Sequence, residues 1–341
     1  MKLIKTEEAV GQVLCHDITQ IIPGKVKGPV FCKGHVISPE DIPVLLNVGK
    51  ENLYVWEADA NMLHENEAAE VLYQICKGDF MHGTEVKEGK IELVADCPGL
   101  LKIDVEKLNK INSLGEMMIA ARHGNFPVKA GDKLAATRVI PLVIEKDKMV
   151  QAQVTAGNEP IFQILPYQHK KVGIVTTGSE IYHKRIEDRF TPVIEKKLKE
   201  FNAEIIEHIV CNDDHQMITN AIHRCIGKGV DMVVCTGGMS VDPDDRTPLA
   251  IKKTGADIIT YGAAVLPGAM FLLAYLEGSI PVIGLPGCVM YAKRTIFDLV
   301  LPRLMAGEVL EKQDFTILGQ GGLCLSCDIC TFPNCGFGKG S

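Results

Sequence analysis

The stretch at residues 236–248 combines glycines and carboxylates in a way that suits a phosphorylated ligand and a metal ion. Its sequence is TGGMSVDPDDRTP, with glycines at 237 and 238 and aspartates at 242, 244 and 245. Glycines let a ligand approach the backbone closely, and N–H groups beside a helix start bind phosphate. Carboxylates repel a phosphate unless a hard cation such as Mg²⁺ lies between them. We therefore expect a site for a phosphorylated ligand with Mg²⁺ in this loop.

The elements around this loop predict that it lies at the end of a buried strand. Residues 232–235 are an apolar run, and Thr247 with Pro248 predicts a helix start, with Thr247 as N-cap and Pro248 at the first helical position. Apolar strands and amphipathic helices alternate throughout residues 170–307, which indicates an α/β domain with a mainly parallel sheet between two helical layers. A hairpin at residues 271–284 predicts that the sheet is mixed.

Three further strand ends carry glycine or acidic residues. In such sheets ligands bind beyond the carboxyl ends of the strands, and the predicted strands at 172–176, 205–210 and 280–284 each run into such a loop. Glycine and aspartate also form ordinary turns and caps, but that alternative explains one loop better than four. The residues expected to line the site from these loops are Thr177, Gly178, Ser179, Glu180, Asp213, Asp214, Pro286 and Gly287.

Four cysteines near the end of the sequence follow the pattern C-x2-C-x2-C-x4-C and can surround one metal centre. They are Cys324, Cys327, Cys330 and Cys335. The first two gaps resemble bacterial ferredoxin ligation, although the last gap is one residue longer and no proline follows. A four-thiolate zinc site is one alternative, and a mobile tail that handles sulfur, copper or molybdenum through free thiols is another. Zinc ribbons place two cysteine pairs far apart, so the compact run favours iron–sulfur.

The whole-chain composition excludes several classes of function. The 341 residues carry a net charge of -7 and no long basic run, so general nucleic-acid binding is not expected. No apolar run reaches the roughly 18 residues of a membrane span, and the first residues lack a signal-peptide core. Twelve cysteines without a secretion signal predict reduced thiols and a cytoplasmic location. Many of the eight cysteines outside the C-terminal group of four are expected to be small buried hydrophobes.

Local composition and hydrophobic pattern divide the chain into three predicted regions. Residues 1–166 contain short β-like runs between Gly and Pro, with helices expected at 39–48, 61–76 and 105–121, which indicates a mixed α+β region. Residues 170–310 form the α/β domain. Residues 319–341 are expected to be a glycine linker followed by the cysteine-rich tail. The first region shows no catalytic constellation, and its histidines are isolated.

Residues 170–307 resemble the molybdopterin-binding domain of molybdenum cofactor biosynthesis proteins. The segment from Thr177 to Glu180 looks like the Thr-Gly-Asp/Ser-Glu motif of the molybdopterin molybdenumtransferases. Residues 236–248 match the Thr-Gly-Gly…Asp…Thr-Pro motif in spacing, and residues 284–287 match the Gly-Leu-Pro-Gly loop. Residues 8–18 and 129–141 resemble parts of the N-terminal region of the same transferases.

The resemblance implies a role for each matched position. Asp245 would be the essential carboxylate that holds Mg²⁺ or orients the reacting group, while Glu180 and Asp213 or Asp214 would shape the pocket. Thr177, Ser179, Thr236, Pro286 and Gly287 belong to the matched binding motifs. The backbone N–H groups implied to hold the phosphate or adenylate are those of Gly178, Gly237, Gly238 and Ser240. The implied chemistry is adenylation of molybdopterin, or insertion of molybdate with release of AMP, in a homo-oligomer.

Two departures from the transferase pattern keep other functions open. Cys288-Val289 stands where those enzymes have Asn-Pro, and residues 267–270 read PGAM where they carry a lysine. A non-catalytic carrier that hands the cofactor to an apo-molybdoenzyme, with a redox- or metal-sensing tail, is therefore the second hypothesis. Asp244-Asp245 also resembles the pyrophosphatase domain of the competence/damage-inducible proteins. A nucleotide pyrophosphatase of the ADP-ribose type is therefore the third hypothesis.

Overall fold

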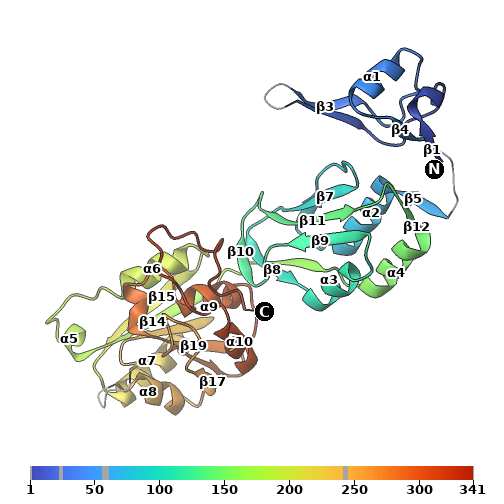
Figure 1. The fold of residues 1–341 in the computed structure, drawn as a ribbon. Helices are drawn as coiled ribbons and strands as arrows, with labels where there is room; N and C mark the ends of the chain where they lie inside the picture. Colours follow the sequence, from blue (N-terminus) through green and yellow to red (C-terminus); the bar gives the residue numbers. More distant parts are fainter. Residues whose placement is uncertain (1, 23–25, 56–60, 241–244, 341) are drawn as a thin grey trace. The chain divides into compact units, whose positions relative to one another are not determined.

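The computed structural model describes residues 2–22, 26–55, 61–240 and 245–340, and it divides into two compact units (Figure 1). The second unit contains the six-stranded sheet and the cysteine-rich stretch. Of the described helices, none is long and apolar enough to cross a membrane. The first unit consists of residues 1–97, 103–122 and 129–164, and the second of residues 98–102, 123–128 and 165–341.

The first unit is made of short antiparallel strands and amphipathic helices. Its four-stranded sheet has the order β6-β7-β11-β9, and three two-stranded sheets pair β1 with β4, β2 with β3, and β5 with β12. The elements are β1 (Lys2–Lys5), η1 (Thr6–Glu8), β2 (Ile18–Ile22), β3 (Val26–Phe31), α1 (Asp41–Asn47), β4 (Asn52–Val55), β5 (Met62–His64), α2 (Glu65–Cys76), β6 (Met81–Gly83), β7 (Lys90–Ala95), α3 (Val105–Asn112), β9 (Met117–Ala121), β11 (Lys133–Val139), β12 (Val143–Glu145) and α4 (Lys146–Ala156).

The helix expected over residues 105–121 is wrong in its second half. Helix α3 ends at Asn112, and Gly115 turns the chain with a φ of 73°. The following residues form β9, which pairs with β11. Met117 and Ile119 are buried while Met118 is exposed, so this segment has the two-residue period of a strand rather than the period of a helix.

The second unit is built on a six-stranded mixed sheet of order β15-β14-β16-β19-β18-β17. The first four of these strands are parallel, whereas β18 runs antiparallel to both β19 and β17. The elements of the sheet and its helices are β14 (Lys171–Thr177), α5 (Ser179–Tyr182), α6 (Thr191–Lys199), β15 (Glu204–Cys211), α7 (His215–Gly227), β16 (Met232–Thr236), α8 (Thr247–Lys253), β17 (Asp257–Tyr261), β18 (Leu272–Leu276), β19 (Ile280–Leu285), η2 (Gly287–Met290), α9 (Ile296–Met305), α10 (Lys312–Thr316) and η3 (Ile317–Gly319). A separate three-stranded sheet joins β10 (Phe126–Val128), β8 (Gly99–Ile103) and β13 (Phe162–Pro166).

Helices cover both faces of the six-stranded sheet, which confirms the α/β fold. One hydrophobic core packs α7 and α8 against one face, and another packs α6 and α9 against the other. Successive residues of β14 point to opposite cores, with Ile174 in one and Val175 in the other. Cys211 and Cys225 lie in the core under α7 and α8, where burial raises the pKa of each thiol to about 11. These two cysteines therefore act as small hydrophobes.

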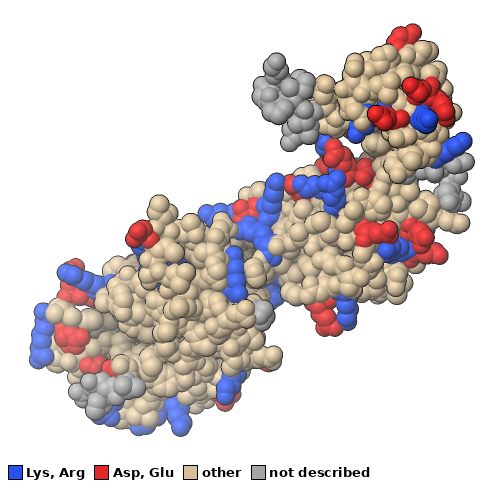
Figure 2. Space-filling model, in the orientation of Figure 1, with Lys and Arg blue, Asp and Glu red and all other residues tan. Residues whose placement is uncertain are grey.

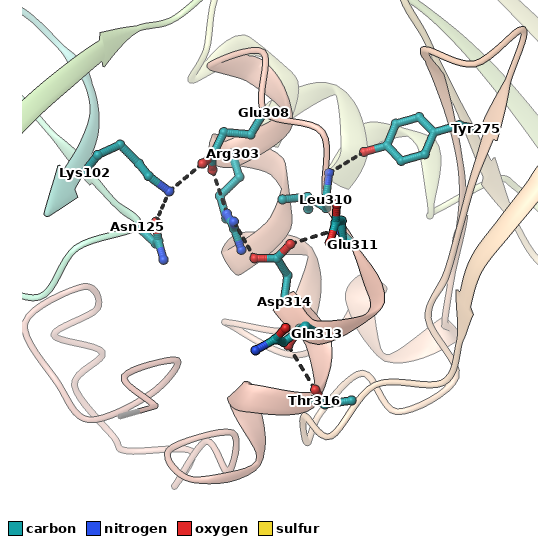
Figure 3. Close-up of polar contacts among 10 residues, drawn as sticks. All are labelled: Lys102, Asn125, Tyr275, Arg303, Glu308, Leu310, Glu311, Gln313, Asp314 and Thr316. Carbon is teal, nitrogen blue, oxygen red and sulfur yellow. Dashed lines mark hydrogen bonds and ion pairs between the residues drawn. The ribbon is translucent and has the colours of Figure 1, made fainter. Parts of the chain in front are cut away.

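An ion network joins α9, α10 and β8 within the second unit (Figure 3). Arg303 donates to Glu308 Oε2 and to Asp314 Oδ1, both at 2.7 Å. Lys102 donates to the other oxygen of Glu308 at 2.5 Å and to Asn125 Oδ1 at 2.6 Å. The Arg303 side chain is only 12% exposed, so this network fixes the end of α9 largely away from water.

Acidic and basic side chains are interspersed on the face of each unit that Figure 2 displays. Both signs of charge occur around the six-stranded domain and around the first unit. The surface in this view therefore has no extended field of one sign among the residues that the structure describes.

Candidate functional site

Four parallel strands of the second unit end at one edge of the sheet. Thr177 is opposite Cys211, Thr176 is opposite Thr236, and Thr236 is opposite Leu285 in the register. The loops after β14, β15, β16 and β19 therefore leave the sheet side by side. The structure thus brings together the four segments that the sequence singled out.

Threonine hydroxyl groups hold the turn after β16 against the end of β14. The Thr247 hydroxyl donates to Gly237 O at 2.9 Å and lies 3.2 Å from the Thr177 hydroxyl. The Thr247 N–H donates to Gly238 O. The helix begins at Thr247 itself, with Arg246 at the cap position. Thr247 is therefore not the N-cap that we expected, because its hydroxyl is used to fix the glycine turn.

Only glycine fits at the two positions of this turn. Gly237 and Gly238 have φ values of 85° and 55°, in the left-handed region that favours glycine. A Cβ atom on Gly237 would lie 2.3 Å from Thr177 O, and one on Gly238 would lie 2.9 Å from the Thr247 hydroxyl. The turn is therefore packed against the neighbouring loop with no space for side chains on that side.

Two of the expected carboxylates accept hydrogen bonds from loop amides. Asp245 Oδ2 accepts from Ser240 N, and Asp213 Oδ2 accepts from Ser179 N, each at 2.7 Å. The Ser240 N–H that the resemblance implies as a phosphate donor is thus bonded to Asp245 in this structure. The carboxylates occupy the anion-binding capacity of these loops, so an incoming phosphate competes with them or is bridged to them by a cation.

Tyr261 is a site residue that the sequence analysis missed. Its hydroxyl donates to Met239 O at 3.2 Å. Burial, together with the nearby negative charge of Asp245, raises the pKa of Tyr261 above its ordinary value. Tyr261 is the last residue of β17, which β19 and β18 separate from β16 in the sheet, and the fold nevertheless brings Tyr261 close to Asp245.

The remaining expected site residues have mixed roles. Asp214, expected as a catalytic carboxylate, accepts from Met217 N through Oδ1 and caps α7, and its catalytic role stays a prediction. Glu180 is exposed, with its carboxyl group close to Gly178. Pro286 is buried and Gly287 is exposed after β19. Residues 241–244, including Asp242 and Asp244, lie outside the described part of the chain.

Two buried polar atoms at this edge have no protein partner among the described residues. They are Asn212 Oδ1, directly after β15, and Thr236 Oγ1, at the end of β16. Buried polar atoms are hydrogen-bonded in most native structures, so an unpaired one calls for a ligand or water. Asn212 was not among the residues expected from sequence, although an amide at a strand end next to two aspartates was the available signal.

The four cysteines of the C-terminal stretch line one cavity of about 230 Å³, together with Lys293, Arg294 and aromatic side chains. Cys327 and Cys330 are exposed, whereas Cys324 and Cys335 are partly buried. In the described parts of the chain, no three His, Cys, Asp or Glu side chains are placed to share one metal ion. The thiols therefore surround a space without converging on a single point.

Comparison with known families identifies the domain that carries the strand-end site. Residues 173–306 match the family model described as "Probable molybdopterin binding domain". This region is therefore similar to molybdopterin-binding domains. Residues 3–57 match a model described as "Domain of unknown function (DUF8806)".

The curated relatives are similar over a short part of the chain. A CinA-like protein of Mycobacterium sp. (strain MCS) is 31% identical over 83 residues, which are 24% of this chain and 20% of that protein. A CinA-like protein of Mycobacterium tuberculosis (strain H37Rv) is 34% identical over 83 residues, which are 24% of this chain and 19% of that protein. The match thus spans about a fifth of the length of these relatives.

Solved structures of two Pyrococcus furiosus proteins are also similar. The tungsten cofactor synthesizing protein MoaB is 21% identical, with a TM-score of 0.31, over 36% of this chain and 84% of that chain. A molybdenum cofactor biosynthesis protein is 14% identical, with a TM-score of 0.28, over 90% of this chain and 64% of that chain.

Proposed function

We propose that the second unit binds molybdopterin or adenylated molybdopterin at the edge formed by Thr177–Glu180 and Thr236–Asp245. The proposed reaction is insertion of molybdate with release of AMP. The observation that carries the proposal is a pair of buried atoms, Asn212 Oδ1 and Thr236 Oγ1, that have no partner among the described residues and lie by a glycine turn that admits no side chain. The match of residues 173–306 to a molybdopterin-binding family supports the choice of ligand.

The residues at this edge supply binding and orientation. The unpartnered oxygens of Asn212 and Thr236 offer hydrogen bonds to a polar ligand, and the Thr177 and Thr247 hydroxyl groups keep the Gly237 turn fixed. A site that is already rigid loses little free energy when it orders a ligand. Amide N–H groups that point toward the negative charge that develops at phosphorus stabilise the transition state.

The donor set at this edge fits Mg²⁺ when the ligand's own phosphate takes part. Mg²⁺ is usually held by one or two carboxylates together with substrate phosphates and water. Asp245 provides such a carboxylate, with one oxygen fixed by the Ser240 amide. A bound Mg²⁺ would supply charge neutralisation at the phosphate, and Asp245 would be the carboxylate that holds the ion.

The loop at residues 267–270 supports a second candidate function. It lacks the lysine of the transferase pattern, and Gly268 packs so closely that a Cβ there would lie 2.5 Å from the Ile296 side chain. The loop is thus held against the start of α9, and none of its four residues is basic. Loss of an oxyanion donor costs about 3 kcal/mol of transition-state stabilisation. This departure favours a carrier that binds the cofactor and delivers it to an apo-molybdoenzyme.

The curated relatives favour keeping a third candidate. They are CinA-like proteins that match this chain over 83 residues. The corresponding function is the nucleotide pyrophosphatase that the Asp244-Asp245 resemblance implies. A homo-oligomer in the cytoplasm is our proposal for the setting of all three functions.

One assay on the full chain separates the three candidates. The chain is purified without oxygen and given adenylated molybdopterin, molybdate and Mg²⁺, and AMP release is followed alongside binding of the pterin. We expect AMP release that requires molybdate. Tight binding without release would exclude the transferase and favour the carrier. Cleavage of ADP-ribose without a response to molybdate would favour the pyrophosphatase.

A matched pair of variants tests the site assignment. Asp245→Asn removes the carboxylate beside the glycine turn and should lower AMP release at least tenfold. Asp231→Asn is the control, because Asp231 also accepts a backbone N–H at 2.7 Å, from Lys171, but precedes β16 at the opposite edge of the sheet. Normal turnover in Asp245→Asn, or an equal loss in Asp231→Asn, would place the reaction elsewhere.

A further inference from the structure

The cavity between the four C-terminal cysteines is built into the second unit. Cys324 N donates to Leu266 O at 2.7 Å, and Leu266 N donates to Gly322 O at 2.8 Å. Gly322 lies so close to the preceding loop that a Cβ atom would come within 2.2 Å of Ala264 O. The glycines that we interpreted as a linker therefore permit a close backbone approach, and this approach anchors the first cysteine.

The last cysteine is anchored by aromatic packing. Cys335 and Phe332 pack against the core under α6 and α9, and Phe337 is buried within that core. The ring centroids of Phe332 and Phe126 are 5.8 Å apart. Two of the four thiols are thus held by the body of the domain, one at each end of the cysteine-rich loop.

The two middle cysteines, Cys327 and Cys330, lie on an exposed loop that is hydrogen-bonded to Lys293. Ser326, between Cys324 and Cys327, has a φ of 51°, a conformation that is uncommon for residues other than glycine. Lys293 Nζ donates to the carbonyl oxygens of Cys327 and Asp328, at 3.2 and 2.8 Å. Hydrogen bonds from Lys293 therefore hold the loop in place although its cysteines are exposed.

Two cations border the cavity. Lys293 and Arg294 both line it. The guanidinium group of Arg294 lies over the Phe332 ring, 4.9 Å from its centroid, and is hydrogen-bonded to Cys330. A centre with four thiolate ligands carries net negative charge. Nearby cations offset that charge where aromatic walls reduce screening by water.

The arrangement of the thiols distinguishes a cluster from a single ion. A tetrahedral zinc ion draws its four sulfur ligands to about 2.3 Å from one point and leaves no space between them. Here all four cysteines line one common cavity of about 230 Å³. A cavity with four cysteines in its wall offers a centre with several metal atoms both its ligands and its space.

We propose that Cys324, Cys327, Cys330 and Cys335 bind a [4Fe–4S] cluster in this cavity. Cysteine thiolates are the usual ligands of such clusters, and the two C-x2-C gaps agree with that ligation. Assembly from equal amounts of ferrous and ferric iron with sulfide releases one proton from each thiol. It changes no oxidation state overall, so no added oxidant or reductant is needed.

Anaerobic reconstitution of the full chain tests the proposal. The metal-free protein is incubated with ferrous and ferric iron and sulfide, then freed of excess reagents. We expect about four iron atoms and four sulfides per chain, with visible charge-transfer absorption and a Mössbauer spectrum of a cubane cluster. Iron that binds equally well without sulfide would contradict a cluster. Stoichiometric zinc in the protein as purified, which iron and sulfide cannot replace, would also overturn it.

Cysteine variants locate the cluster. The double variant Cys327→Ser/Cys330→Ser changes two exposed side chains, so it should fold normally. The amounts of iron and sulfide bound per chain should fall at least tenfold. Cys32→Ser is the matched control, because Cys32 is also exposed but lies in the first unit. Unchanged cluster content in the double variant would refute the assignment. Neither outcome depends on whether the strand-end site binds molybdopterin.

Discussion

At the residue scale, hydroxyl groups and backbone atoms hold the glycine turn after β16 in the described part of the chain. Thr177 and Thr247 are buried, and their hydroxyl groups lie 3.2 Å apart. Such uncharged contacts fix the position of Gly237 without adding charge beside a phosphate. Charge enters the site through Asp213 and Asp245, whose carboxylates are fixed by backbone amides.

Replacing Gly237 should disturb this turn more than an equivalent change elsewhere. Gly237→Ala places a Cβ atom 2.3 Å from Thr177 O at a φ of 85°, so we expect a loss of about 3 kcal/mol of unfolding free energy. Gly255→Ala is the control, because Gly255 has a φ of 83° and open space around its Cβ position. It should lose only about 1 kcal/mol. Urea unfolding measures the unfolding free energy of both variants. Equal losses of this free energy would show that the turn is not tightly packed.

At the element scale, Asp188 fixes the start of α6. Its Oδ1 atom accepts from Phe190 N at 2.8 Å and from Thr191 N at 3.0 Å, and its Oδ2 atom accepts from the Thr191 hydroxyl at 2.5 Å. Burial alone would raise the pKa of Asp188, but these hydrogen bonds and the nearby His208 lower it below its ordinary value. The ionised carboxylate therefore stabilises the folded state.

The contribution of Asp188 should depend on pH in a defined direction. Because its folded-state pKa is below the unfolded value near 4, its stabilisation is fully present above that value and is lost as pH falls through the folded-state pKa. Asp188→Asn should lower the unfolding free energy by about 1 kcal/mol at pH 7 and by much less near pH 3. Asp257→Asn, on an exposed residue, should show no such trend. Denaturation between pH 3 and pH 7 measures the difference in unfolding free energy between Asp188→Asn and the unchanged protein. A difference that does not vary with pH would contradict stabilisation by the ionised carboxylate.

The ion network of α9 makes a second prediction about the elements (Figure 3). Arg303→Met leaves Glu308 and Asp314 without their shared cation in a poorly hydrated position, so we expect a loss of about 3 kcal/mol. Arg224→Met also removes a 2.7 Å ion pair, with Glu207, but the Arg224 side chain is 65% exposed. That control should change stability little. Similar losses in the two variants would mean that burial does not set the strength of the network.

The sequence predicted most of the strand-and-helix order of the second unit because most of its strands are continuous apolar runs, but it missed β17, which has no buried residue. It failed where the backbone departs from simple periodicity. The segment after Asn112 contains enough apolar residues for a helix, yet Gly115 turns the chain and Met117 starts a strand. The hydroxyl contact from Thr247 to Gly237 and the approach of Tyr261 to Asp245 depend on how the backbone folds between these residues. Local patterns of residue type do not specify those paths.

At the scale of the whole molecule, the two proposed sites lie in the same unit but use different structural elements. The molybdopterin site is formed by loops after β14, β15, β16 and β19. The cluster site is formed by the C-terminal stretch and by Lys293 and Arg294, which precede α9. Few side chains are shared, so the free energies of the two binding events should be nearly independent.

This independence can be measured through thermal stability of the full chain. Molybdopterin at about 100 times its Kd should raise the unfolding free energy by about 2.7 kcal/mol. The reconstituted cluster should add its own increment, and the two increments together should add within about 0.5 kcal/mol. Asp245→Asn should remove only the increment from molybdopterin, and Cys327→Ser/Cys330→Ser only that from the cluster. Calorimetry of the four ligation states provides the test. A combined increment well above or below the sum would show that the segment from Pro286 to Arg294, which follows β19 and leads to the cysteine cavity, couples the two sites.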